Sequence, residues 1–442
     1  MMSTDAAANK LASARMTTVA PALGDIWAPA GAAGFCIAVV NRPTDSGGVL
    51  SVAPAYTPFT TIHRSPAGVV AGILMARLFI SHWSTPMRGP RRILILGASY
   101  GALLGTKLAA AGHHVTLVGL PNEVARINDD GCRLRLPVRG IDGLIEIHSR
   151  TLAGSIDAAS PGVAEPARYD LVVLAMQEPQ YRAPAIRRLL VAIAVADRPV
   201  LSVMNMPPLP FLKRIPSLDA AALEACYTDA TVWDPLDPSR VTLCSPDPQA
   251  FRPPGEEVNV LQVRLATNFK AAPFERDDDN ALLLELAESV EGVRYDIGAE
   301  RVDLPVKLRV PGSIFVPMAK WCMLMAGNYR CFAENRIVSI RDAVHRDLAA
   351  SRAVYDDVTD LCVGLGASRD DLVPFEKYAN AALSLESPSS VARALAAGAT
   401  HIERVDRLVA TIAEGAGRPL FAVYDIVARV DTWLTRNRAE AA

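Results

Sequence analysis

Residues 92–109 read Arg92-Ile-Leu-Ile-Leu-Gly97-Ala-Ser-Tyr-Gly101-Ala-Leu-Leu-Gly105-Thr-Lys-Leu-Ala109. A short apolar run ends in glycine, a helix of small residues follows, and a second apolar run, Val115-Thr-Leu-Val118, comes after Gly112. The order strand, tight turn, helix, strand is typical of the βαβ unit that binds a dinucleotide. Gly97 lets the chain turn, and the N–H groups at the start of the helix then face a pyrophosphate.

The turn between strand and helix is the predicted cofactor-binding segment, namely Gly97, Ala98, Ser99, Tyr100 and Gly101. Its spacing departs from G-x-G-x-x-G, because the turn is one residue shorter and Ser99 stands where a glycine is usual. Gly101 is expected to let the backbone approach the pyrophosphate. The alternative is a set of glycines that only packs a helix against a sheet, with no nucleotide.

Composition agrees with an enzyme of two or three domains. The chain has 442 residues, half of them hydrophobic, and a net charge of −2 without a basic stripe, so nucleic acid is not an expected partner. Its seven cysteines are scattered, with no Cys-x-x-Cys pair. This pattern predicts reduced thiols in a cytoplasmic protein and no metal site.

The chain divides into three predicted parts. Residues 1–90 are rich in small residues and proline without a sustained apolar period, so residues 1–86 are expected to be disordered or to lie upstream of the true start. The apolar run 67–80 contains Arg77 and is too short to span a membrane. Residues 91–312 are expected to form an α/β dinucleotide-binding domain of the Rossmann type, and residues 313–442 an all-helical domain.

Two further apolar runs, 170–175 and 199–204, are typical of buried parallel strands. Gln177 and Asn205 follow them, and the carboxyl ends of such strands face the ligand. Residues 232–257 hold six prolines, which predicts a long irregular excursion that could serve as a lid or substrate-side loop.

One helix is predicted over Ile314–Tyr329, strongly apolar but with Lys320 in its middle and Asn328 eight residues later. At 3.6 residues per turn, Lys320, Leu324 and Asn328 lie on one side. A lysine in such a run either extends to the surface or is held in a cleft for chemistry.

These motifs together resemble the ketopantoate reductase family. The resemblance rests on Gly97 to Val118, Leu-Ala-x-Gln-x-x-Gln at 174–180, Asn205 and the Lys-x7-Asn helix, and it covers about 91–205 and 313–410. In that family NADPH reduces a 2-oxo acid in the cleft between a Rossmann domain and a helical domain.

The resemblance implies roles for particular residues. Lys320 falls on the catalytic lysine, and Asn205 and Asn328 fall on asparagines that bind substrate or cofactor. Ser390 matches a substrate-binding serine, whereas Glu403 matches only with a one-residue insertion and would pair with Lys320 or a substrate hydroxyl. Without a functional role, Ser390 would be a helix N-cap and Glu403 part of a solvated helix face.

Some positions depart from the family pattern. Gln177 replaces a lysine that contacts cofactor, Leu324 a second asparagine, and Leu120 an arginine that grips the 2′-phosphate of NADPH. No acidic residue ends the second strand, although Asn122 and Glu123 are near. The expected cofactor is therefore NADP(H), with NAD(H) as the alternative, and ketopantoate is one substrate among other 2-oxo acids.

The predicted function is the NAD(P)H-dependent reduction of a small 2-oxo acid, with Lys320 as general acid. No membrane partner is expected, and the helical domain would be the surface of a homodimer. One alternative is a related β-hydroxyacid or opine-type dehydrogenase, which a substrate screen would separate. The other is a non-catalytic NAD(P)-binding sensor, which would bind cofactor without turnover.

Overall fold

The computed structural model describes residues 40–42, 49–52, 60–63, 89–332 and 336–441, and the chain divides into two compact units, Met1–Met87 and Arg88–Ala442. In the first unit the described residues form three short antiparallel strands in the order β1-β2-β3: β1 (Val40–Arg42), β2 (Val49–Val52) and β3 (Thr60–His63). The rest of the expected N-terminal extension lies outside the described residues.

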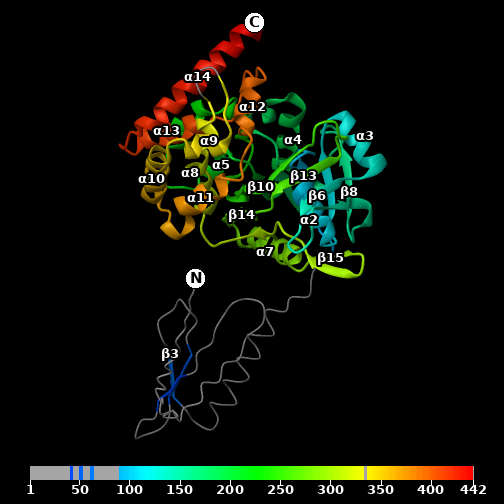
Figure 1. Cartoon of the computed structure of the whole chain (residues 1–442). Coiled ribbons are helices and arrows are strands. Elements are labelled where there is room, and N and C mark those ends of the chain that lie inside the picture. The colour runs from blue at the N-terminus through cyan, green and yellow to red at the C-terminus, as the bar shows by residue number, and fades with distance from the viewer. Residues whose placement is uncertain (1–39, 43–48, 53–59, 64–88, 333–335, 442) are drawn as a thin grey trace, which may run out of the picture. The chain divides into compact units, whose positions relative to one another are not determined.

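The second unit is built on an eight-stranded sheet in the order β17-β14-β11-β10-β9-β4-β5-β8 (Figure 1). Its strands are β4 (Arg92–Leu96), β5 (His114–Val118), β8 (Ser155–Ala159), β9 (Leu171–Leu174), β10 (Val200–Val203), β11 (Val241–Ser245), β14 (Phe269–Ala271) and β17 (Leu308–Arg309). The six strands from β8 to β11 are parallel, and β14 turns the sheet antiparallel.

Apolar residues on both faces explain why these strands lie in the middle of the unit. Ile93 and Ile95 of β4 belong to one buried cluster, while Leu94 and Leu96 belong to another on the opposite face. All four are completely buried, as expected of a parallel strand covered on both sides. The predicted strands around 92–96, 170–175 and 199–204 are therefore confirmed.

A second, four-stranded sheet has the order β12-β13-β6-β7, with β6 (Arg133–Pro137), β7 (Leu144–His148), β12 (Gln249–Phe251) and β13 (Val260–Leu265). A small hairpin joins β15 (Arg294–Ile297) to β16 (Glu300–Asp303). The irregular excursion predicted over 232–257 is thus wrong in part, because it contains the buried strand β11 as well as β12. The prolines lie on either side of Val241–Ser245 and none lies within it, so the composition of the wider segment hides a short apolar strand.

Helices alternate with the strands up to β17, and the described chain after β17 is mainly helical. The helices among the sheet strands are α2 (Gly101–Ala110), α3 (Pro121–Asp130), α4 (Pro184–Val195), α5 (Leu209–Leu212), α6 (Ala220–Leu223) and α7 (Asp277–Glu291). After β17 come α8 (Ala319–Ala326), α9 (Ile340–His345), α10 (Leu348–Leu365), α11 (Phe375–Ala382), α12 (Ser390–Ala396), α13 (Val405–Gly415) and α14 (Phe421–Ala441). The predicted class, a Rossmann-type sheet followed by a helical region, is confirmed.

The sheet and the later helices share one hydrophobic core. Leu94 and Leu174 of the sheet belong to the same buried cluster as Trp321 of α8 and Val409 of α13. The division at 312/313 stays a prediction, since the structure joins both parts in the unit Arg88–Ala442. None of the helices in the described ranges is long and apolar enough to cross a membrane.

Candidate active site

A cavity of about 660 Å³ brings together residues that are far apart in the sequence. Seven of the predicted site residues line it: Tyr100, Gln177, Asn205, Lys320, Asn328, Ser390 and Glu403. The other predicted cofactor-binding residues, Gly97, Ala98, Ser99 and Gly101, are not part of its lining. The cavity therefore lies between the carboxyl ends of β9 and β10 on one side and α8 and α12 on the other.

The turn after β4 has the geometry that its glycines require. Gly97 has a φ of +115°, and a Cβ there would lie 2.6 Å from the carbonyl oxygen of Ala175. A Cβ on Gly101 would lie 2.6 Å from Cγ2 of Ile95. The constraint visible at Gly101 is thus the packing of α2 on the sheet, and its role toward a pyrophosphate stays a prediction.

The start of α2 has no side-chain cap, because Tyr100 at the N-cap position supplies no side-chain hydrogen bond to the helix. The N–H groups of Ala102 and Leu103 donate instead to the backbone carbonyl oxygens of Ser99 and Tyr100, each at 3.1 Å, so the binding of a phosphate at this turn stays a prediction. The Tyr100 hydroxyl points elsewhere and donates to the carbonyl oxygen of Pro248 at 2.7 Å.

Asn205 and Glu403 form a polar pair at the sheet side of the cavity. The Asn205 amide donates to Oε2 of Glu403 at 3.3 Å, and the Glu403 side chain is almost completely buried. Burial, together with the nearby Glu178 carboxylate, raises the pKa of Glu403 to about 7. The solvated helix face considered for Glu403 is therefore wrong, because the residue is buried and precedes α13.

The predicted continuous helix over Ile314–Tyr329 is wrong. The segment consists of a 3₁₀ turn η7 (Val316–Met318), α8, and a second 3₁₀ turn η8 (Asn328–Arg330). The break falls at Gly327, whose φ and ψ are −129° and −71°. A Cβ there would lie 2.0 Å from the hydroxyl of Tyr378, so packing from α11 leaves room only for glycine at this point.

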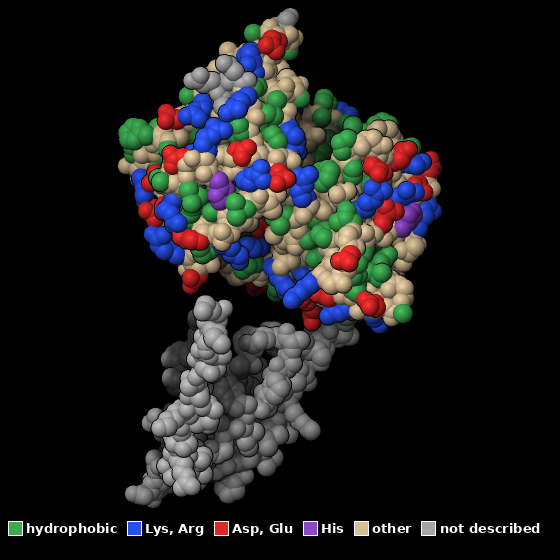
Figure 2. All heavy atoms as spheres, in the orientation of Figure 1, with side chains coloured by type: hydrophobic (Ala, Val, Ile, Leu, Met, Phe, Trp, Pro, Cys, Tyr) green, Lys and Arg blue, Asp and Glu red, His purple; other side chains and the backbone are tan. Residues whose placement is uncertain are grey.

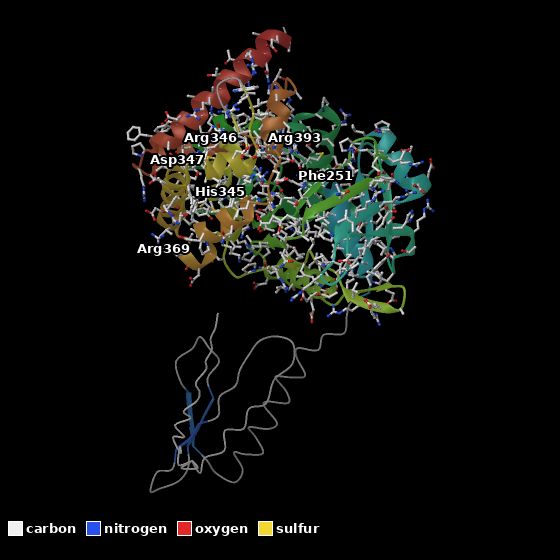
Figure 3. The ribbon with its side chains drawn as sticks, viewed as in Figure 1. Phe251, His345, Arg346, Asp347, Arg369 and Arg393 are labelled. Carbon is white, nitrogen blue, oxygen red and sulfur yellow. The ribbon has the colours of Figure 1, made fainter. Side chains whose placement is uncertain are left out.

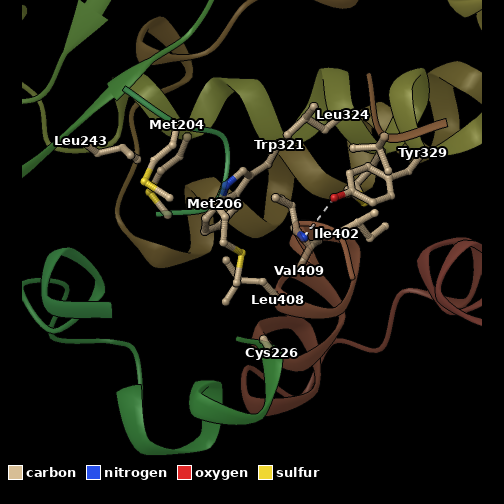
Figure 4. Close-up of a cluster of buried hydrophobic side chains, with 14 of the residues drawn as sticks. Met204, Met206, Cys226, Leu243, Trp321, Leu324, Tyr329, Ile402, Leu408 and Val409 are labelled. Carbon is tan, nitrogen blue, oxygen red and sulfur yellow. Dashed lines mark hydrogen bonds between the residues drawn. The ribbon is translucent and has the colours of Figure 1, made fainter. Parts of the chain in front are cut away.

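Lys320 and Asn328 nevertheless line the same cavity, whereas Leu324 does not. Leu324 is buried in the core together with Trp321 (Figure 4). The neighbouring turn is also fixed, because the Tyr329 hydroxyl donates to the backbone carbonyl of Glu403 and accepts from the N–H of Val405 at 3.3 Å. Apolar packing around α8 thus holds Lys320 at the cavity wall.

The carboxylate that faces Lys320 is Asp247, not Glu403. Nζ of Lys320 lies 3.4 Å from Oδ1 of Asp247, and both side chains are mostly buried, at 14% and 12% exposure. Nζ of Lys270 in β14 lies 3.5 Å from Oδ2 of Asp247, and the Ser245 hydroxyl donates a hydrogen bond to Asp247. The predicted pairing of Lys320 with Glu403 is therefore corrected, and Asp247 is a site residue that the sequence analysis missed.

Ser389 and Ser390 begin α12 at the other wall. Ser389 is the N-cap, because its hydroxyl accepts from the N–H of Ala392 at 3.1 Å and donates to the carbonyl oxygen of Asn328 at 2.8 Å. Ser390 is exposed and lines the cavity. The helix N-cap is therefore Ser389, and not Ser390 as had been considered, and the Ser390 hydroxyl is available to a ligand.

Beyond β5, the position expected for a 2′-phosphate arginine is Leu120, which is 66% exposed. Glu123 turns back to accept from the N–H of Leu120 at 2.7 Å and forms an ion pair with Arg252. A Cβ on Gly119 would lie 2.8 Å from Oε2 of Glu123, so this carboxylate lies directly over the end of β5. Arg252 also lines the cavity and was missed from the sequence, because it follows β12 in the proline-rich segment.

Comparison with known proteins gives one family match. Residues 93–205 match the family described as "Ketopantoate reductase PanE/ApbA". Among curated proteins, none matches the chain.

Two solved structures share the fold. A PanE/ApbA family ketopantoate reductase from Ralstonia eutropha JMP134 is 18% identical and superimposes with a TM-score of 0.51 over 78% of this chain and 99% of its own. The 2-dehydropantoate 2-reductase from Methylococcus capsulatus is 13% identical, with a TM-score of 0.54 over 78% of this chain and 97% of its own.

The family match confirms the resemblance found in the sequence over residues 93–205, and the two solved structures show that the fold of residues beyond this range is shared as well.

Proposed function

We propose that the chain is an NAD(P)H-dependent reductase that converts a 2-oxo acid into the 2-hydroxy acid, with Lys320 as general acid. The observation that carries this proposal is the shared cavity. Tyr100, Gln177 and Asn205 line it from the nucleotide-binding side, and Lys320, Asn328 and Ser390 line it from the helical side.

The chemistry assigns a task to each side of the cavity. The reduced nicotinamide supplies a hydride to the carbonyl carbon, and negative charge then develops on the carbonyl oxygen. Lys320 stabilises this charge and donates the proton that completes the hydroxyl group. Asn328 and Ser390 are the hydrogen-bonding groups for the rest of the substrate, and Asn205, held by Glu403, orients the reacting groups.

The charges around the cavity favour an anionic substrate. Arg264 and Arg393 line it together with Lys320, and neither arginine has a carboxylate partner within the described part of the chain. Their guanidinium groups are anchored on consecutive residues, Arg264 on the Ser387 hydroxyl and Arg393 on the Pro388 carbonyl, each at 2.7 Å. Guanidinium groups bind carboxylates in a bidentate geometry.

Lysine and arginine side chains are visible on the face where β13 and α12 lie (Figure 2). Figure 3 marks Phe251 of β12 and Arg393 of α12 on this face. Phe251 is also the ring on which the Arg264 guanidinium lies, 5.1 Å from the ring centroid.

The test is a screen of 2-oxo acids, ketopantoate included, with NADPH and with NADH, followed by Lys320→Ala on the best substrate. We expect kcat to fall by at least ~10² while cofactor affinity, measured by fluorescence titration, changes little. Lys377→Ala, which removes an exposed lysine of α11, serves as the matched control. Substantial activity left in Lys320→Ala would exclude this lysine as the proton donor.

A further inference from the structure

The ion pair between Lys320 and Asp247 joins two segments that lie far apart in the sequence. Lys320 lies in α8, and Asp247 follows β11 in the proline-rich segment. Lys320 lines the cavity, whereas Asp247 does not, although its neighbours Pro246 and Pro248 do. The carboxylate therefore holds the ammonium group from the protein side and leaves the cavity side of Lys320 to a ligand.

Asp247 is itself firmly placed. Its carboxylate accepts a hydrogen bond from the Ser245 hydroxyl and forms ion pairs with the ammonium groups of Lys320 and Lys270. Although burial opposes its ionisation, Lys320, Ser245 and Lys270 together hold the pKa of Asp247 below its usual value. The group is thus a carboxylate at neutral pH.

The other titratable groups around this pair do not compete for its role. Burial is the main cause that raises the pKa of the Cys244 thiol and of the Tyr100 hydroxyl well above their usual values, with a smaller contribution from the charge of Asp247, so both stay protonated. Glu403 lies in the same cavity lining and changes its charge near pH 7. Its ionisation precedes the alkaline range, and Glu403→Gln, which removes it, leaves the contribution of Asp247 to be measured alone. The remaining charged groups of the lining are Arg252, Arg264 and Arg393.

We propose that Asp247 is the positioning residue of this site, which holds the Lys320 ammonium group in an ion pair and orients its side chain toward the cavity. The inference rests on the proposed function of Lys320 as proton donor. The carboxylate lies on the protein side of the ammonium group, so removing its charge changes both the direction of the Lys320 side chain and the balance between its ammonium and amine forms. After the proton has gone to the substrate oxygen, the neutral amine takes a new proton from solvent while Asp247 keeps its place.

The first test does not depend on turnover. The folded full chain is treated with acetic anhydride over pH 7–11, and the acetylation rate of Lys320 is followed by peptide mass spectrometry, because only the neutral amine reacts. In Asp247→Asn the onset of acetylation should move down by about 1–2 pH units. Asp247→Glu should restore much of the wild-type onset. Ser245→Ala, which leaves the carboxylate in place but less well held, should give a smaller change in the same direction.

The second test uses the best 2-oxo acid. The alkaline limb of the pH profile of kcat should move to lower pH in Asp247→Asn by the same interval as the acetylation onset. At pH 9 kcat should fall about tenfold, with KM changed less than kcat. Asp279→Asn is the matched control, because Asp279 is also mostly buried and forms an ion pair at 3.0 Å, but its partner Arg240, unlike Lys320, does not line the cavity. It should move neither the acetylation onset nor the alkaline limb.

The outcomes separate the two proposals. An unchanged acetylation onset in a folded Asp247→Asn protein, judged by its circular dichroism, would overturn the role of Asp247. If the onset moves as expected but the wild type reduces no 2-oxo acid, the ion-pair inference holds and the proposed reaction is wrong. If Asp247→Asn does not fold, Ser245→Ala decides by the same measurement, and no change in its onset overturns the inference.

Discussion

Glu403 is the buried carboxyl group whose charge changes near neutral pH. Burial raises its pKa to about 7, while the same group in the unfolded chain loses its proton near its usual value of 4.5. Between these two values the folded protein binds more protons than the unfolded chain. The free energy of unfolding therefore falls as pH rises through this window, by up to about 3 kcal/mol in total.

Glu403→Gln removes this titration but keeps an amide that can pair with Asn205. We expect the variant to gain stability relative to the wild type between pH 5 and pH 8, measured by urea denaturation at both values. Glu288→Gln, at an exposed position of α7, should show no such trend. A difference between Glu403→Gln and wild type that is the same at both pH values would contradict the raised pKa.

Glu123 and Arg252 are the residues at the end of β5, where the ribose of a dinucleotide is expected. A carboxylate there favours a free 2′-hydroxyl, whereas a guanidinium group favours a 2′-phosphate. Because the two charges offset each other, we expect less than a hundredfold preference between NADPH and NADH, with NADPH favoured by family resemblance. Glu123→Gln should shift binding toward NADPH and Arg252→Met toward NADH in fluorescence titrations. A larger preference in the wild type would show that another residue binds the ribose.

At the scale of the elements, α2 carries an unusual side chain for a helix packed on a sheet. Lys107 is completely buried and donates to the carbonyl oxygens of Pro305, at 2.8 Å, and Leu304, at 3.4 Å. Burial, and then the neighbouring Lys307, lower the pKa of Lys107 to about 7. Helix α2 therefore holds a lysine whose charged form opposes folding below that pH.

Lys107→Met should stabilise the protein. In the wild type the unfolded chain binds more protons than the folded one between about pH 7 and the usual lysine pKa of 10.5, so wild-type stability rises with pH across that window. The advantage of the methionine variant should be about 1 kcal/mol or more at pH 7, after the loss of the hydrogen bond to Pro305, and should shrink by pH 10. Urea denaturation at both pH values measures it, and a variant less stable than wild type at pH 7 would contradict the argument.

Elements defined by local sequence could be predicted. The strands around 92–96, 170–175 and 199–204 are continuous apolar runs, and Gly97 marks the turn because only glycine adopts its φ of +115° without strain. Elements defined by distant contacts could not. At Gly327, where α8 ends, the room for a side chain is taken by Tyr378, some fifty positions away.

The candidate site divides in the same way. Lys320, Asn205 and Asn328 were found because they lie in or directly after apolar runs that match the family pattern, and they line one cavity. Asp247 was missed because its significance comes from an ion pair across 73 positions, in a segment whose prolines indicate only irregular structure. Nothing in the sequence around such a carboxylate indicates which distant lysine it will pair with in the fold.

At the scale of the whole molecule, the site depends on the shared core of the unit Arg88–Ala442. Its two walls are joined by one buried cluster, which contains residues of the sheet and of α8 and α13. We expect this unit to unfold in one transition, and substitutions at the cavity to leave that transition intact.

The N-terminal unit is predicted to be dispensable for this core. In the described residues, β1, β2 and β3 pair only with one another, and the eight-stranded sheet is complete with strands from β4 onward. A chain beginning at Met87 should therefore melt in a single transition within about 1–2 °C of the full chain, which corresponds to a change of about 1 kcal/mol for a unit of this size. Its kcat and cofactor affinity should equal those of the full chain. A larger drop in Tm would mean that residues before Met87 contribute to the stability of the catalytic unit, and an unchanged Tm with altered cofactor affinity would instead indicate a contribution to binding.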